Sequence, residues 1–344
     1  MQAVRLHGPR DLRVNEVELP SLGDREAMVK VAFSAICGSD KRWYTVGTHV
    51  MPLTLGHEFS GIVEEVKDSR HQDLVGHRVG VMPLMPCGHC TYCLNGLPNL
   101  CTGYSYLGSR RDGGFAQYAA VPVQNLVPLP DSIDLADAAI MVDPVSVALH
   151  ALRQGGYRTG MRVTVIGGGA VGLSVFLWLH FAFNENAVTV VDRVPEKVAF
   201  AKSLGGDAFT DSDPLLKELD SQMELVVLAT PAPEAISTAL ELVARRGTIV
   251  MPGIPYKTIS VEAMTWEKLL RKEARLIGSW NYAWTDYPEN ECQTTLRYLA
   301  AGTLKPTMIV THRFTFDQAK EAFNTAFNNN KAEVVMFAAS EVTG

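Results

Sequence analysis

Four cysteines lie within a fifteen-residue segment, CGHCTYCLNGLPNLC, at a spacing that can bind a metal ion. Gly88, Asn95, Gly96 and Pro98 supply the turns that let such a segment loop around one ion. Zinc binds four thiolates tetrahedrally, and a site without an open position is structural. The sequence therefore predicts a structural zinc lobe at about residues 86–102. Its ligands are Cys87, Cys90, Cys93 and Cys101.

Two other readings of these cysteines compete with zinc. The thiols could form two disulfides or serve four unrelated roles, as cysteines do in other settings. An iron–sulfur cluster is the stronger rival, but its short motif ends in Cys-Pro. Here Thr102 follows Cys101, so the sequence favours zinc.

A second group of metal-binding residue types precedes the lobe. Cys37 lies in the segment ICGSD, and His57 and Glu58 follow in LGHEFSG. A thiolate, an imidazole and a carboxylate suit a catalytic zinc site that keeps one position open for water or substrate. Taken singly, Cys37 is better explained as a small buried hydrophobic residue and His57 as a hydrogen-bonded polar one. Their occurrence beside a zinc lobe and a nucleotide motif favours the metal site.

A glycine motif indicates a dinucleotide. Gly167, Gly169 and Gly172 form G-x-G-x-x-G in the turn GGGAVG, directly after the apolar run MRVTVIG. The glycines permit a tight turn, close approach of a pyrophosphate, and close helix–strand packing. Backbone N–H groups near Ala170 and Val171, at the start of the next helix, can face the phosphates. The alternative is an ordinary strand–helix turn.

The residue that chooses the cofactor is expected at the end of the next strand. Asp192 lies twenty residues beyond Gly172, where a carboxylate can accept hydrogen bonds from both adenosine ribose hydroxyls. The same carboxylate would repel a 2′-phosphate, so the sequence favours NAD over NADP. Arg193 is the opposing feature, because an adjacent guanidinium could bind a 2′-phosphate. Asp192 could also be a solvated residue at a strand end.

Bulk composition restricts the partners. The 344 residues include 31 basic and 37 acidic side chains, and the net charge of -6 disfavours nucleic acid or an anionic membrane as the main partner. The first residues resemble no signal peptide. We expect no membrane span, because the longest apolar run, 173–183, is too short. Only Cys37 and Cys292 lie outside the cluster, so we expect a reduced, cytoplasmic protein.

The chain changes character along its length, which predicts two domains. Up to about residue 130, short β-like runs broken by Gly and Pro indicate a partly open barrel. A helix is expected from about Leu135 to Leu152, interrupted near Asp143-Pro144. From about Gly160, strands and helices alternate, which predicts a doubly wound parallel sheet. The last sixty residues are expected to rejoin the first domain.

Together, GHE, ICGSD, the four-cysteine lobe and GGGAVG resemble the zinc-dependent medium-chain alcohol and polyol dehydrogenases. The resemblance covers essentially the whole chain, with its motifs in the family's order. It implies an α/β protein in which a Rossmann domain, residues 151–280, divides a GroES-like catalytic domain, residues 1–150 and 281–344. It also implies two zinc ions per chain, NAD as cofactor, and a homodimer or homotetramer.

The resemblance assigns roles to individual residues. Cys37 and His57 match zinc ligands, and Glu58 matches a ligand or an exchanging partner. Asp143, before Pro144, stands where most relatives have an acidic residue that reaches zinc directly or through water. Ser39 would pass the substrate's proton outward through cofactor ribose or water. Lys197 resembles the lysine that contacts the adenosine ribose, although a solvated helix lysine explains it equally well.

Within the family, two segments look most like the galactitol-1-phosphate 5-dehydrogenase type: LGSRRDGGFAQY and LLRKEARLIGSWNY. This predicts a polyol phosphate substrate gripped by Arg110 or Arg111, with Arg110 favoured. The alternative is a solvated turn whose arginines pair with surface acids. Trp280 and Tyr282 are candidates for lining the substrate site or for the core. Other functional readings are an unphosphorylated polyol, sugar acid or amino alcohol as substrate, or a non-catalytic nucleotide-binding protein.

Overall fold

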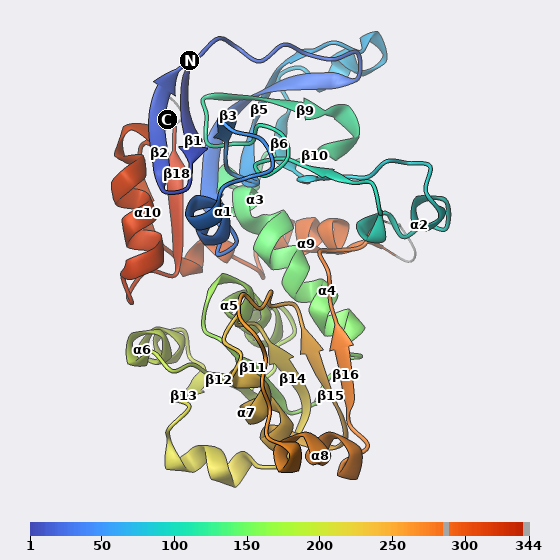
Figure 1. The fold of residues 1–344 in the computed structure, drawn as a ribbon. Helices are drawn as coiled ribbons and strands as arrows, with labels where there is room; N and C mark the ends of the chain where they lie inside the picture. Colours follow the sequence, from blue (N-terminus) through green and yellow to red (C-terminus); the bar gives the residue numbers. More distant parts are fainter. Residues whose placement is uncertain (285–288, 340–344) are drawn as a thin grey trace. The chain divides into compact units, whose positions relative to one another are not determined.

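The structure is a computed structural model that describes residues 1–284 and 289–339 (Figure 1). The chain forms two units, Met1–Asp143 with Ala283–Gly344, and Pro144–Tyr282. The first boundary lies before the expected residue 150, because the chain leaves helical geometry at Asp143, where φ is -131° and ψ is 123°. Asp143 therefore stays with the first unit, which also holds Cys37 and His57.

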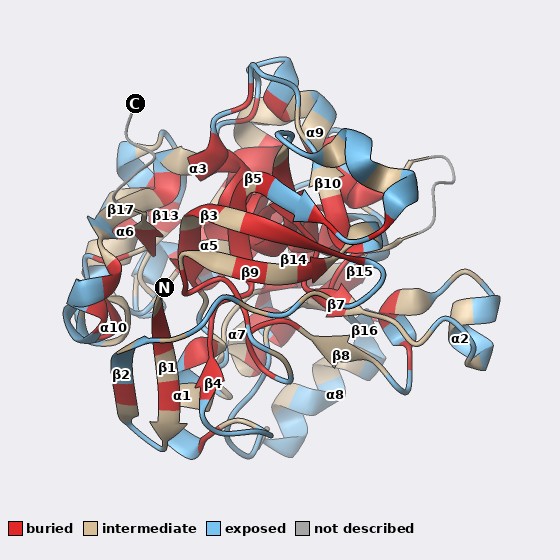
Figure 2. Ribbon diagram, turned by 90° about the horizontal axis from the view of Figure 1, so that it is seen from above, coloured by how far each residue is buried: buried red, intermediate tan, exposed pale blue. Residues whose placement is uncertain are grey.

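The first unit is built on a seven-stranded sheet around the long strand β3 (Glu26–Ile36). Its path runs β10-β6-β5-β3-β18-β17, and β9 also pairs with β3. Side chains of β3 and β5 are mostly buried, as Figure 2 shows. The other strands of this sheet are β5 (Glu58–Val66), β6 (Arg78–Val81), β9 (Tyr118–Pro122), β10 (Leu126–Pro128), β17 (Val310–Phe314) and β18 (Val334–Ala338).

Smaller elements complete the first unit. β18 pairs antiparallel with β3, so the end of the chain joins the sheet that begins near its start. A three-stranded sheet has the order β2-β1-β4, and β7 pairs with β8. The strands are β1 (Gln2–Gly8), β2 (Asp11–Glu16), β4 (Leu53–Thr54), β7 (Leu84–Met85) and β8 (Ser105–Tyr106). The α-helices are α1 (Asp40–Val46), α2 (Thr91–Leu94), α3 (Leu135–Ile140), α9 (Glu291–Ala300) and α10 (Ala319–Asn328).

The second unit is a six-stranded parallel sheet with the order β13-β12-β11-β14-β15-β16. This is the doubly wound order, which reverses between β11 and β14 and leaves a binding crevice beyond the carboxyl ends of the strands there. The strands are β11 (Val163–Ile166), β12 (Val188–Val191), β13 (Asp207–Phe209), β14 (Met223–Leu228), β15 (Val243–Met251) and β16 (Arg275–Gly278). The helices are α4 (Val147–Gln154), α5 (Ala170–Leu177), α6 (Pro195–Ser203), α7 (Ala235–Leu242) and α8 (Ala263–Arg271).

The helical stretch from Leu135 to Gln154 is the one described segment that is long and apolar enough to cross a membrane. The prediction that no run has this length rested on residues 173–183 as the longest apolar run. The structure buries 94% of its apolar window inside the protein. Burial of this kind is the property of a core helix.

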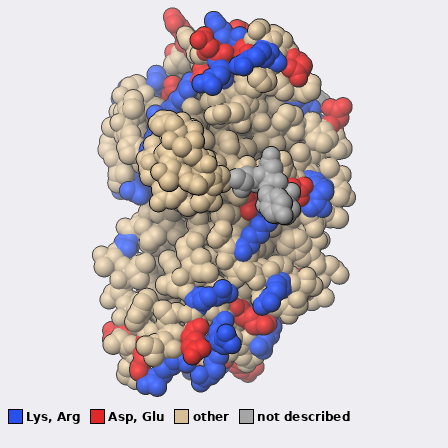
Figure 3. Space-filling view, turned by 90° about the vertical axis from the view of Figure 1, so that its right-hand side faces the viewer, with Lys and Arg blue, Asp and Glu red and all other residues tan. Residues whose placement is uncertain are grey.

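Charged side chains of both signs lie interspersed on the face drawn in Figure 3. That face shows no extended area of a single sign. The distribution agrees with the modest net charge of -6 and gives no surface there that matches the phosphate backbone of a nucleic acid.

A buried lysine ties the end of α7 to the strand that follows it. The Lys272 Nζ donates to the carbonyls of Leu240 at 2.9 Å, Glu241 at 2.6 Å and Val243 at 2.8 Å. These carbonyls are at the carboxyl end of α7, where the helix dipole favours a cation. Lys272 is 8% exposed. It therefore fixes a helix whose first turn lies at the nucleotide crevice.

We predict that Lys272→Met lowers the free energy of unfolding by about 2–4 kcal/mol, because buried carbonyls lose their donor. Lys268→Met is the matched control, since Lys268 is partly exposed and pairs with Glu241 at 3.3 Å. The control should cost less than about 1 kcal/mol. Urea denaturation of the zinc-loaded proteins measures both. Equal losses in the two variants would contradict the role given to Lys272.

Candidate metal centres and dinucleotide site

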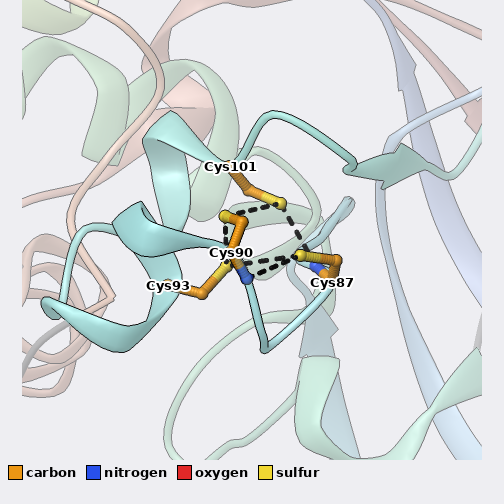
Figure 4. A group of neighbouring side chains, drawn as sticks. All are labelled: Cys87, Cys90, Cys93 and Cys101. Atoms are coloured by element: carbon orange, nitrogen blue, oxygen red, sulfur yellow. Dashed lines mark hydrogen bonds between the residues drawn. The ribbon is translucent and has the colours of Figure 1, made fainter.

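The four cysteines of the lobe converge on one point (Figure 4). Their sulfur–sulfur distances include 3.5 Å between Cys90 and Cys93, 3.8 Å between Cys90 and Cys101, and 4.0 Å between Cys87 and Cys93. A zinc–sulfur bond of about 2.3 Å gives a tetrahedron whose edge is about 3.8 Å. The arrangement therefore has the dimensions of a four-thiolate zinc site.

Backbone geometry supports the same interpretation. Gly88 and Gly96 have φ values of 78° and 74°, a conformation that glycine adopts at low cost and that closes the loop. N–H groups of the loop lower the pKa of Cys87 and of Cys90, the latter to about 5. None of the six cysteines, all of which lie in the described residues, forms a disulfide, so the structure contradicts the disulfide alternative.

The second group lies where β3 and β5 run side by side. The two strands are antiparallel, and Ala35 pairs with Glu58. Cys37, just after β3, is thereby placed next to His57 and Glu58 at the start of β5. Ligand atoms of Cys37, His57 and Glu58 all lie within 4.8 Å of one another.

Asp143 reaches the edge of this group. Its Oδ2 is 3.9 Å from His57 Nε2, and the side chain is buried. The break in the helix before Pro144 turns it toward the cluster. It is not one of the three side chains whose ligand atoms are mutually close, so its approach to a metal, directly or through water, stays a prediction.

Asp40 is a site residue that sequence analysis did not single out. Its Oδ2 accepts a hydrogen bond from the Cys37 backbone at 3.0 Å, and its Oδ1 is 3.6 Å from His57 Nδ1. Asp40 is fully buried. A carboxylate beside one imidazole nitrogen is the usual arrangement at metal-binding histidines, where it orients the ring once the hydrogen bond forms. The only signal in the sequence was its place three residues after Cys37 in ICGSD.

The acidic groups of the cluster are buried together, which disfavours their ionised forms unless a cation is bound. Burial, then Asp143 and Asp40, raise the pKa of the Cys37 thiol to about 12, although hydrogen bonds from Ser39 offset part of this shift. Burial and the neighbouring thiol and carboxylate raise the pKa of Glu58 well above its usual value. Burial alone would lower the pKa of His57, but Asp40 and the other carboxylates reverse the shift.

Glu58 Oε1, in the cluster, has no hydrogen-bond partner among the described residues. His57 Nδ1 and Asp40 Oδ1 face each other at 3.6 Å and are also unpartnered, whereas the other ring nitrogen, Nε2, lies nearest to Asp143. Unpartnered buried polar atoms are costly unless a ligand satisfies them. The donor set of Cys37, His57 and Glu58 therefore fits a zinc ion, which would let the thiol and the carboxylate ionise together.

The glycine turn of the second unit has the geometry of a dinucleotide site. Gly167 has a φ of 109°, and a Cβ there would lie 2.8 Å from the Ala229 carbonyl. A Cβ on Gly172 would lie 1.8 Å from the Gly167 carbonyl, so the helix packs too closely for a side chain. At Gly169 a Cβ would meet nothing within 4 Å. Packing within the protein therefore does not require a glycine at position 169. Close approach of a ligand to the backbone explains it instead.

Asp192 has two roles in this turn. It accepts hydrogen bonds from Gly168 N at 2.7 Å and Val194 N at 2.9 Å, so it holds the glycine turn to the end of β12. It also lines a pocket of about 170 Å³ together with Arg193. Two exposed carboxylates that the sequence analysis missed, Asp211 and Glu234, line the same pocket.

The remaining candidates have different outcomes. Lys197 lies on α6, with its Cβ close to the glycine turn at Gly168. Arg111 is paired with Glu26, while Arg110 is exposed and lies over Tyr104.

Trp280, just after β16, is 38% exposed, and Tyr282 is fully buried, which assigns Tyr282 to the core.

Comparisons with known proteins agree with both halves of the chain. Residues 23–131 match the alcohol dehydrogenase GroES-like domain, and residues 170–297 match the zinc-binding dehydrogenase family. Galactitol 1-phosphate 5-dehydrogenase of Escherichia coli K12 is 33% identical over 92% of this chain and 94% of its own. Sorbitol dehydrogenase of Bacillus subtilis 168 is 28% identical over 98% of this chain and 97% of its own.

Solved structures show the same fold. The crystal structure of galactitol-1-phosphate dehydrogenase from Escherichia coli superposes with a TM-score of 0.88, at 32% identity, over 98% of this chain and 100% of that chain. The rspB alcohol dehydrogenase from Escherichia coli CFT073, solved with NADH, gives a TM-score of 0.88 at 28% identity, over 98% of this chain and 99% of that chain.

These matches confirm the expected fold of a GroES-like domain with a Rossmann domain, and the expected cofactors, zinc and NAD. The non-catalytic alternative is thereby set aside. The chain belongs to the zinc-binding dehydrogenases that carry an alcohol dehydrogenase GroES-like domain, and it is an oxidoreductase of the alcohol and polyol dehydrogenase type.

Proposed function

We propose that the protein oxidises a secondary hydroxyl of a sugar-alcohol phosphate, of the galactitol 1-phosphate to tagatose 6-phosphate type, with NAD as hydride acceptor. The observation that carries this proposal is the exposed guanidinium of Arg110, the first residue of the pair Arg110–Arg111, in the same unit as the Cys37 cluster. Guanidinium groups bind phosphate through two parallel hydrogen bonds. Similarity to galactitol 1-phosphate 5-dehydrogenase along 92% of the chain supports the proposal.

In the proposed reaction the carbinol carbon loses a hydride, its hydroxyl loses a proton, and a ketone forms. Cys37 and His57, with Glu58 or Asp143, would hold one zinc. When bound, zinc supplies a Lewis acid that lowers the pKa of a hydroxyl, and NAD accepts the hydride. The chain's own residues would orient the zinc ligand His57 and carry the substrate proton away from the site. Asp40, 3.6 Å from His57 Nδ1, would orient the His57 ring, and the Ser39 hydroxyl, which hydrogen-bonds Cys37, would carry the proton outward.

An unphosphorylated polyol is the second candidate substrate. Sorbitol dehydrogenase of Bacillus subtilis aligns over 98% of this chain, at 28% identity. We further propose that the protein works in the cytoplasm as a homodimer or homotetramer. Its six free cysteines suit a reducing compartment, and the oligomer is carried over from the family resemblance.

The first test of the function compares phosphorylated and free substrates. We predict that kcat/KM with NAD is higher for galactitol 1-phosphate than for galactitol or sorbitol by about tenfold or more, the scale of a charge-assisted hydrogen bond. Initial rates of NADH formation measure this. If galactitol or sorbitol is an equal or better substrate, the proposal of a polyol phosphate substrate is wrong, and an unphosphorylated polyol takes its place.

A second prediction concerns separable zinc sites. Cys37→Ser should leave one zinc per chain and an intact fold, and should lower kcat by more than about 100-fold. Cys93→Ser should instead make the segment 86–102 sensitive to proteases, because metal binding there is also folding free energy. Metal analysis, circular dichroism and limited proteolysis distinguish the two. Cys292→Ser is the matched control, a buried cysteine outside both clusters that should keep both zinc ions. Full activity in Cys37→Ser would contradict the assignment.

A third prediction concerns Asp192. Asp192→Ser should raise the KM for NAD by about tenfold or more, because the ribose loses its acceptor and the glycine turn loses two hydrogen bonds. NADP should become usable through Arg193, and more so when Asp211→Asn removes a second carboxylate from the pocket. Adding Arg193→Ala should remove that gain. A native enzyme that already prefers NADP would contradict the role given to Asp192.

A further inference from the structure

The two adjacent arginines have different surroundings. Arg111 forms an ion pair with Glu26, whose side chain is only 11% exposed. Glu26 is itself held by Gly23 N, which donates to its Oε2 at 2.8 Å. Breaking this pair would leave the negative charge of a largely buried carboxylate without a partner. The Arg111 guanidinium therefore stabilises the fold and stays paired with Glu26.

The Arg110 guanidinium is exposed and is preorganised on the protein surface. It lies over the Tyr104 ring, 4.2 Å from the ring centroid, and its Nη1 donates to the Tyr104 carbonyl at 2.7 Å. A guanidinium has five N–H donors, so most of its donors point elsewhere. A planar cation held flat on an aromatic ring loses little further freedom when it binds a phosphate.

The ring under Arg110 belongs to an aromatic row that begins at the metal cluster. The Tyr104 and Tyr106 centroids are 6.4 Å apart, and Tyr106 meets the His57 ring edge-on at 5.7 Å. Tyr104 and Tyr106 are two residues apart in an extended segment, so both rings lie on the same side of it. The row therefore runs from His57, by way of Tyr106 and Tyr104, to Arg110.

The backbone fixes this row relative to the cluster. A Cβ on Gly108 would lie 2.5 Å from the carbonyl of Gly56, and Gly114 N donates to that carbonyl at 2.8 Å. Gly56 directly precedes His57. The N–H groups of Arg110 and Arg111 both bond the Tyr106 carbonyl, at 3.0 and 3.2 Å. The arginine turn is thus tied to the segment that carries the candidate zinc ligand.

We propose that Arg110 binds the phosphate of the substrate and that Tyr104 is the positioning residue that presents it, whereas Arg111 has a structural role. The polyol chain lies along Tyr106 and Tyr104, with the carbon to be oxidised at the His57 end and the phosphate at the Arg110 end. This inference rests on the proposed function. It adds a specificity-determining arginine and the two tyrosines that connect it to the reacting centre.

The test compares the ratio of kcat/KM for galactitol 1-phosphate to that for galactitol in five zinc-loaded proteins. The proteins are the wild type, Arg110→Ala, Arg111→Gln, Tyr104→Phe and Tyr104→Leu. Arg110→Ala should lower the ratio by about tenfold or more, because galactitol has no phosphate to lose contact with. Tyr104→Leu should lower the ratio about two- to fivefold, the scale of an exposed cation–π contact. Tyr104→Phe keeps the aromatic ring and should have the wild-type ratio.

Arg111→Gln is the matched control. It removes the neighbouring charge and the Glu26 ion pair, so it should lower the melting temperature and leave the ratio unchanged. A wild type without preference for galactitol 1-phosphate overturns the proposed function and this inference with it. A wild type with that preference, combined with an unchanged ratio in Arg110→Ala or a lowered ratio in Arg111→Gln, overturns this inference alone.

Discussion

The pairing of β3 with β5 is the constraint on which the rest of the first unit depends. Their antiparallel register sets Cys37 beside His57 and Glu58, and the turn after β3 adds Asp40 beneath the imidazole. The result is a buried set of one thiol, one imidazole and several carboxylates. Such a set opposes its own ionisation, because each added negative charge raises the pKa of the next group. A divalent cation would resolve the conflict, and the same cation would supply the Lewis acid that the proposed reaction needs.

The second unit has to bind a dinucleotide, and few residues shape its site. Its parallel sheet reverses direction between β11 and β14, and the glycine turn after β11 leaves space at Gly169 for a ligand to approach. Asp192 holds that turn and also lines the pocket beside it. In the proposed role of Asp192, one side chain would both shape the phosphate site and select NAD over NADP.

Residues close together in sequence could be predicted well. The cysteine spacing, the G-x-G-x-x-G turn and the helix break before Pro144 each depend on local geometry, and the structure has all three. The inner strands of the Rossmann unit, β11, β12 and β14, were also predictable, because parallel strands buried on both faces appear in the sequence as continuous apolar runs. The short edge strand β13 was not predicted, since only its central residue is buried. The strands near the two ends of the chain were harder to identify. β1, β2 and β17 are only partly buried, and β18, although buried between β3 and β17, is only five residues long.

Features that depend on contacts distant in sequence could not be predicted. Nothing near Asp40 shows that it faces His57, since that contact depends on the pairing of β3 with β5. Likewise Arg110 and Arg111 are indistinguishable in sequence, and it is the pairing of Arg111 with Glu26, on the distant strand β3, that the sequence does not show. Asp211 reaches the nucleotide pocket because β13 lies beside β12.

The central claim is that each chain holds two chemically different zinc sites. Zinc-edge X-ray absorption on the purified protein tests it most directly, because it counts sulfur neighbours. Four sulfurs at the lobe and one at the Cys37 cluster average to about 2.5 per zinc, with nitrogen and oxygen completing the second site. That average is the predicted result. A spectrum with sulfur alone at about four per zinc, from one zinc in each chain, would show that the Cys37 cluster binds no metal and would contradict the account.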